Sequence, residues 1–165
     1  MSAPNVFEPQ FDADRDGPVH THRRARLGRQ AGAERLGASL YELPPGQAAW
    51  PIHYHLANEE LLIVLRGRPS LRTLDGEREL DQGEVVACPV GERGANQVVN
   101  RSDGAARILI VSEMRAPDIV RRPESGKLSA FEGAPGSAAA EEGFHGLFFE
   151  RDAVGFWDGE EPPPP

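Results

Sequence analysis

Between residues 35 and 114, Gly, Pro, Asn and Asp divide the chain into short segments rich in Val, Ile, Leu and Tyr. Short strands at this spacing are typical of an all-β sandwich or barrel. No capped run of helical periodicity reaches about twelve residues, so little helix is expected. The eight predicted strands span residues 35–43, 48–55, 59–66, 70–74, 77–80, 84–88, 96–100 and 106–114.

Local signals refine this picture. Asp75-Gly76 lies between two predicted strands and predicts a hairpin with a type I′ turn, whose central residues both need positive φ angles. The one segment that could hold a turn of helix is residues 120–131. The apolar wall of the interior is expected to contain Leu62, Val64, Val85, Val98, Ile108 and Ile110.

Composition shifts divide the chain into a main domain and flanking segments. Residues 1–18 are polar and Asp-rich, which predicts a flexible tail, and residues 19–131 hold the β domain. Residues 132–143 are small and acidic and are expected to be a linker. The aromatic segment 144–158 is expected to pack back on the domain or on a partner subunit, and residues 159–165 form a Pro-rich tail.

Charge and hydropathy exclude several classes of partner. The net charge of −8 disfavours nucleic acid and anionic membrane, which would repel the chain at long range. The longest apolar run, Leu61 to Leu65, is far shorter than the roughly 20 residues of a membrane span. The N-terminus lacks a signal pattern, so a cytoplasmic protein is expected. Cys88 is the only cysteine and is expected to be a buried, inert thiol.

The pattern His53-Tyr-His55 followed by Glu60 is the strongest chemical signal in the sequence. Alternate residues of a strand face the same side, so His53 and His55 project together and Tyr54 points away. If the next strand pairs antiparallel, the Glu60 carboxylate can reach both imidazoles. Two histidines and one carboxylate suit a divalent transition metal and leave positions open for a substrate.

Other polar groups are given more ordinary interpretations. His20 and His22 form a second pair at the same spacing, but no carboxylate follows at ligand spacing, so a solvated strand is expected. Five arginines form a basic cluster that is expected to be a solvated edge, because an anion-binding role would require them at a pocket rim. They are Arg23, Arg24, Arg26, Arg29 and Arg35.

Two stretches, 46–67 and 83–100, resemble the paired motifs of the cupin superfamily, G-x5-H-x-H-x3–4-E-x6-G and G-x5-P-x-G-x2-H-x3-N. One extra residue follows Gly46, and two extra residues follow Gly91. The matching positions are Gly46, His53, His55, Glu60, Gly67, Gly83, Pro89, Gly91 and Asn100. The Gly67 spacing also favours Glu60 over Glu59 as the ligand. The resemblance implies a jelly-roll β-barrel with an interior pocket.

The sequence departs from the family at the fourth metal ligand. Where the second motif has His, this chain has Asn96. An amide oxygen binds Zn, Ni, Cu or Fe more weakly than an imidazole does, so metal affinity should fall. The expected metal site therefore consists of His53, His55 and Glu60, with Asn96 as a weak fourth ligand. The expected ion is Fe, Mn, Zn or Ni.

The resemblance implies two alternative functions. In the first, the metal acts in an enzyme of dioxygenase, isomerase or decarboxylase type on a small-molecule substrate. In the second, the barrel binds a sugar or an anionic metabolite with little or no metal and no catalysis, and Asn96 supplies hydrogen bonds. Cupin resemblance also implies a homodimer.

Overall fold

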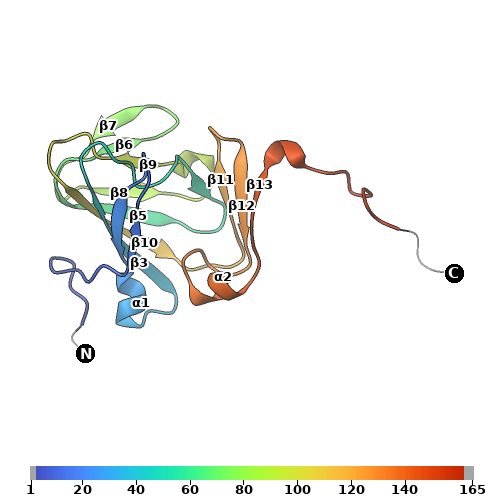
Figure 1. Cartoon of the computed structure of the whole chain (residues 1–165), viewed down its shortest axis with the longest axis horizontal. Coiled ribbons are helices and arrows are strands. Elements are labelled where there is room, and N and C mark those ends of the chain that lie inside the picture. The colour runs from blue at the N-terminus through green and yellow to red at the C-terminus, as the bar shows by residue number, and fades with distance from the viewer. Residues whose placement is uncertain (1–2, 162–165) are drawn as a thin grey trace.

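The structure is a computed structural model that describes residues 3–161, and its strands form three sheets with only short pieces of helix (Figure 1). The largest sheet has six strands in the order β1-β2-β3-β10-β5-β8. Their bounds are Ala13–Arg15 (β1), His22–Ala25 (β2), Leu36–Leu43 (β3), Ala106–Glu113 (β10), Glu60–Arg66 (β5) and Val85–Cys88 (β8).

Two smaller sheets complete the fold. The three-stranded sheet, in the order β7-β6-β9, contains Glu77–Glu79 (β7), Ser70–Arg72 (β6) and Gln97–Val99 (β9). The four-stranded sheet, in the order β13-β12-β11-β4, contains His145–Phe149 (β13), Lys127–Phe131 (β12), Asp118–Arg122 (β11) and Tyr54–His55 (β4). The helical pieces are Leu27–Ala31 (α1), Ala138–Glu142 (α2) and the 3-10 turns Glu92–Gly94 and Glu150–Asp152.

The main hydrophobic core joins the six-stranded sheet to the three-stranded sheet. Leu62 and Ile108 of the large sheet are 0% exposed and belong to one cluster with Val98 of the small sheet. All predicted wall residues are buried except Val85, which is 57% exposed. The prediction for Val85 is wrong because β8 is an edge strand on which Val86, not Val85, lies opposite Leu62 and shares its face.

The predicted hairpin is present, but its turn is not type I′. Strands β6 and β7 pair antiparallel with Arg72 opposite Glu77. No described residue other than glycine has a positive φ, so Asp75 cannot occupy a type I′ turn. Instead, the Thr73 N–H donates to the Gly76 carbonyl at 2.8 Å, and the Thr73 hydroxyl accepts from the Asp75 N–H at 3.2 Å. The turn therefore lies one residue earlier than predicted, and the side chain of Thr73 stabilises it there.

The turn of helix considered for residues 120–131 is wrong. These residues belong to the antiparallel hairpin of β11 and β12, in which Arg122 lies opposite Lys127. The reversal occurs at Pro-Glu-Ser-Gly, where Gly126 adopts a φ of 60°. Pro and Gly at this spacing are a turn signal that outweighs the weak helical pattern.

Several elements lie where the sequence predicted a tail and a linker. Strand β1 falls within residues 1–18 and pairs with β2, and α2 falls within residues 132–143. The Ser137 hydroxyl caps α2 by accepting from the Ala140 N–H at 3.1 Å. Residues 1–2 and 162–165 of the two predicted tails lie outside the described part of the chain. No described helix is both long enough and apolar enough to span a membrane.

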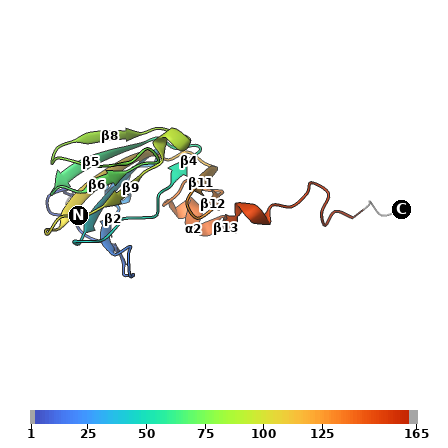
Figure 2. The same ribbon diagram turned by 90° about the horizontal axis from the view of Figure 1, so that it is seen from above.

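The aromatic C-terminal segment joins the fold only in its first part. Strand β13 pairs with β12 along its whole length. The described chain after β13, residues 150–161, runs away from the sheets in both views (Figures 1 and 2). Phe156 is 84% exposed and Trp157 is 76% exposed, so these two side chains do not cover the domain in the single chain.

Candidate metal centre

Strand β4 and the residue before it carry the two histidines. The His53 N–H donates to the Asn96 carbonyl at 3.1 Å, and the Asn96 N–H donates back to His53 at 2.9 Å. His55 lies opposite Val120 of β11. Tyr54 is 6% exposed and packs in a separate cluster, so the predicted alternation of these side chains is observed.

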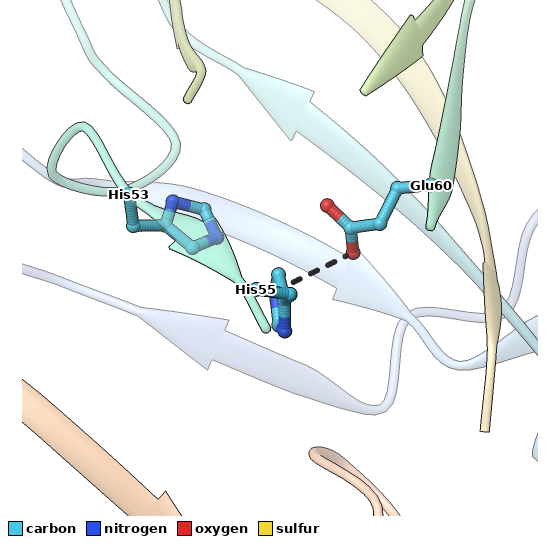
Figure 3. Close-up of side chains that lie close together, drawn as sticks. All are labelled: His53, His55 and Glu60. Atoms are coloured by element: carbon cyan, nitrogen blue, oxygen red, sulfur yellow. Dashed lines mark ion pairs between the residues drawn. The ribbon is translucent and has the colours of Figure 1, made fainter. Parts of the chain in front are cut away.

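Glu60 begins β5 and brings the carboxylate to the histidines. Glu60 Oε1 lies 3.8 Å from His55 Nε2 (Figure 3). One ligand atom each from His53, His55 and Glu60 all lie within 4.8 Å of one another, a group that could hold a metal ion. Glu59 has an exposed side chain and is not part of this group.

Hydrogen bonds fix which nitrogen of each imidazole is available. His53 Nδ1 lies 3.1 Å from the Pro51 carbonyl, which can only accept, so Nδ1 carries the proton and Nε2 keeps its lone pair. His55 Nδ1 donates to Asp118 Oδ2 at 2.5 Å, which leaves His55 Nε2 facing Glu60. Both Nε2 atoms are thus prepared as metal ligands.

Burial and charge set the protonation of the group. Burial, assisted by the neighbouring His55, lowers the pKa of His53 to about 3, so His53 is neutral and able to bind metal at neutral pH. Burial also lowers the pKa of His55, but the hydrogen bond to Asp118 and the charges of Glu60 and Asp118 outweigh it, and the net shift is upward. Burial raises the pKa of Glu60 despite the attraction of His55.

Asp118 is the functional residue that the sequence interpretation missed. Its side chain is fully buried at the start of β11. One carboxylate oxygen accepts from His55, and the other accepts from the Ala57 N–H at 2.9 Å. Asp118 lies outside both motifs and follows a Pro in a polar stretch, so only the pairing of β11 with β4 reveals it. A buried carboxylate in this position holds the ring of a metal-binding histidine.

Asn96 lies directly beside the group through its pairing with His53. Residues opposite each other in an antiparallel pair project on the same face, so the two side chains share one face. Asn96 is 2% exposed and its Nδ2 donates to the Gly94 carbonyl at 3.1 Å. Its Oδ1 is buried with no hydrogen-bond partner among residues 3–161. A buried carbonyl oxygen without a donor is costly unless a ligand or an ion completes it.

A pocket of about 440 Å³ opens at the three candidate ligands, and we call it the metal-site pocket. Tyr41 and Trp50 form part of its wall. Arg24, Arg26 and Arg29 line it as well, so three arginines of the predicted basic cluster reach a pocket. Another part of its wall comes from the segment predicted as a linker, through Pro135, Gly136 and Ser137.

Cys88 takes no part in this chemistry. It is 6% exposed and lies opposite Glu60 on the neighbouring strand. Burial, with a contribution from the negative charge of Glu60, raises the pKa of the Cys88 thiol to about 12. The thiol is therefore protonated at neutral pH, which agrees with the predicted inert cysteine.

Comparison with known proteins gives a family and a set of similar folds. A family model described as the cupin domain matches residues 39–112. A structure of a cupin-superfamily sugar phosphate isomerase from Silicibacter pomeroyi has a TM-score of 0.75 and 20% sequence identity, covering 94% of this chain and 97% of that chain.

Two further structures are also similar. A protein from Acidithiobacillus ferrooxidans, proposed to be a sugar phosphate isomerase, has a TM-score of 0.69 and 21% identity, covering 81% of this chain and 80% of that one. The polyketide cyclase RemF from Streptomyces resistomycificus has a TM-score of 0.60 and 25% identity, covering 74% of this chain and 84% of that one. The comparison with curated proteins gives no match.

Proposed function

We propose that this protein is a metal-dependent enzyme that acts on a small, oxygen-rich substrate. Its chain contains a cupin domain and has the mostly β cupin fold, as the sequence predicted. The observation that carries the proposal is the convergence of His53, His55 and Glu60 within 4.8 Å at one pocket. Of the reaction types that the family suggests, we favour isomerisation of a sugar phosphate, the activity named for two structures of similar fold.

The donor set supports a divalent metal. Two imidazole nitrogens and one carboxylate oxygen suit Fe, Mn, Zn or Ni. A metal bonded to two such atoms at about 2.1 Å holds them at most about 4.2 Å apart. The 3.8 Å between His55 Nε2 and Glu60 Oε1 is within that limit, and the three ligand atoms all lie within 4.8 Å of one another, so the side chains would move closer together around an ion. An ion bound there would supply a Lewis acid that polarises a substrate oxygen.

The remaining pocket residues can bind and orient a substrate. Burial keeps the pKa of Tyr41 above its ordinary value, so its phenol can donate a hydrogen bond at neutral pH. Arg24 offers a positive charge to a phosphate, and its guanidinium is held at 3.1 Å from the Ser39 hydroxyl. The loop at residues 135–137 forms another part of the lining of the same space.

A second candidate function is supported by Asn96. An amide in the fourth position gives a weaker metal site than a histidine would, and its unpartnered Oδ1 could accept a hydrogen bond from a ligand instead. In this alternative the barrel binds a sugar or an anionic metabolite without a metal and without turnover.

The two candidates are separated by metal analysis of tag-free protein purified without chelator. The protein is dialysed against Fe(II), Mn(II), Zn(II) or Ni(II) in turn, and bound metal per subunit is measured. We expect about one equivalent of at least one metal, lost in His53→Ala. The matched control is His145→Ala, because His145 is exposed and only stacks on Phe131 at 4.2 Å.

The metal-loaded protein is then incubated with aldose and ketose phosphates, and their interconversion is followed by NMR. Metal near zero under all four conditions contradicts the enzyme proposal and leaves the binding function. Full metal binding that survives His53→Ala contradicts the proposed site. Metal binding without any interconversion removes the sugar phosphate assignment but leaves the metal centre intact.

A further inference from the structure

A second pocket of about 650 Å³ lies beside the metal-site pocket. It is formed mainly by the parts of the chain on either side of the cupin motifs, with Arg15 from β1, His22 and Arg24 from β2, and Arg122 and Lys127 from the β11–β12 hairpin. It contains none of the candidate metal ligands. Its volume is in the range that small-molecule sites occupy.

The charge of this second pocket is opposite to that of the protein. The chain has a net charge of −8, yet Arg15, Arg24, Arg122 and Lys127 line the pocket and Asp14 is its one carboxylate. Asp14 is 4.0 Å from Arg23, a residue outside the lining. A concave site with several cations and little counter-charge attracts anions.

Two of the arginines are partly buried without a carboxylate partner. Arg122 donates to the Ser129 hydroxyl at 2.7 Å, and Arg24 donates to the Ser39 hydroxyl at 3.1 Å. Among the described residues, neither guanidinium forms an ion pair. Burial lowers the pKa of Arg122, which reflects the cost of a charge held away from water with no opposite charge. An anion placed between the guanidiniums would offset that cost.

The wall of the second pocket also holds unpartnered polar atoms. Trp50 Nε1 and His22 Nδ1 are buried and have no hydrogen-bond partner within residues 3–161. Trp50 Nε1 can only donate. Buried polar atoms in native proteins are normally satisfied, so an unpaired donor beside cations indicates an oxygen-rich ligand.

The second pocket shares part of its wall with the metal-site pocket. Arg24, Tyr41 and Trp50 line both. The Trp50 ring lies 5.7 Å from the His53 ring on one side and 5.1 Å from Tyr41 on the other. Arg24 and Trp50 therefore bring the second pocket next to the candidate metal ligands.

We propose that the second pocket binds the phosphate or carboxylate group of a small molecule through Arg24, Arg122 and Lys127. The site is built from its own residues and binds anions with or without a metal. Only the step that assigns the anion to the substrate of the metal centre rests on the proposed function.

Trp50 provides a direct reporter for this site. The chain has two tryptophans, and Trp157→Phe removes the exposed one, so the remaining fluorescence comes from Trp50. Metal-free Trp157→Phe protein is titrated with pyrophosphate and, separately, with citrate, against sodium chloride at matched ionic strength. We expect a saturable change with at least one of the two anions. The tighter of the two identifies phosphate or carboxylate as the preferred group.

The decisive comparison is Arg122→Gln against Arg121→Gln in this background. Both variants lose one charge from β11, but Arg121 lies outside the second pocket and pairs with Glu150 at 2.6 Å. We expect Arg122→Gln to weaken anion binding about tenfold or more and Arg121→Gln to change it little. Lys127→Gln, at an accessible position, provides a second test if Arg122→Gln does not fold.

Two results would overturn the proposal. One is the absence of a saturable response beyond that of chloride. The other is an equal loss in the variants at 121, 122 and 127, which would show a general charge effect. The same titration of His53→Ala separates this proposal from the proposed function, because anion binding should persist there while metal binding is lost.

Discussion

The central region of the chain, residues 36–113, and the flanking segments, residues 3–35 and 114–161, contribute different parts of the site. The central region holds His53, His55 and Glu60. The flanking segments supply Asp118, which fixes His55, and all four arginine and lysine side chains that line the second pocket. The candidate metal chemistry therefore resides in the centre, whereas the flanks set the geometry and charge around it.

The same division predicts a difference in stability. Leu62 is 0% exposed in the central core, so Leu62→Ala should lower the free energy of unfolding by about 2–5 kcal/mol through lost burial and a cavity. Leu147 on β13 is 55% exposed, and Leu147→Ala should change the free energy by only about 0.5 kcal/mol or less. Urea unfolding measures both. A cost at Leu147 equal to that at Leu62 would show that β13 is packed as tightly as the central core.

Replacing Asp118 tests whether the flank controls the central metal site. Asp118→Asn keeps the size of the side chain and an acceptor for His55 Nδ1 but removes the negative charge. Loss of such a partner typically lowers metal affinity about 10–100-fold. Competition titration with a chromophoric chelator measures the change.

The matched control is Asp103→Asn, because Asp103 is exposed in a loop and lines neither pocket. It should leave metal affinity unchanged. Equal affinities for Asp118→Asn and the unmodified protein would mean that the hydrogen bond to His55 does not govern metal binding, and that the central region alone forms the centre.

Asn96 offers a smaller test within the central region itself. Asn96→His should raise metal affinity by about tenfold, because imidazole is the better donor for these ions, and Asn96→Ala should lower it if Oδ1 contacts the metal. The same competition titration applies. If the alanine variant binds metal as well as the unmodified protein does, Asn96 is not a ligand.

The sequence was most informative where local patterns carry structure. All eight predicted strands contain observed strands, because alternation and turn residues act over a few positions. Alternation also placed His53 and His55 together and separated Glu60 from Glu59. One residue of register was harder to predict: Val85 faces out because pairing with β5, and not the strand's own composition, decides which side is buried.

Long-range pairing explains most of what the sequence did not reveal. Asp118 and His55 are 63 residues apart in the sequence. Their side chains meet only because β11 pairs with β4. Arg122 lies in the second pocket for the same reason, and His22, expected on a solvated strand, lines that pocket. Neither motif contains these residues. The predicted homodimer and cytoplasmic location stay predictions.

The smallest expected effect concerns how α2 is held beside the metal-site pocket. Glu141 of α2 lies 3.3 Å from Arg26 and 3.4 Å from Arg29, and these partly exposed pairs join two flanking segments at the pocket. Pairs of this kind contribute up to about 1 kcal/mol each. Glu141→Gln should therefore leave global unfolding almost unchanged and increase amide exchange in residues 135–142.

Glu142→Gln is the matched control for hydrogen exchange, because Glu142 is exposed and forms no ion pair among the described residues. Faster exchange in Glu141→Gln alone would show that charge pairs hold the segment that lines the metal-site pocket. Equal exchange in both variants would mean that backbone pairing, such as the 2.9 Å bond from the Glu132 N–H to the Phe144 carbonyl, is sufficient. Charge pairs would then not be what holds this flanking segment at the metal-site pocket.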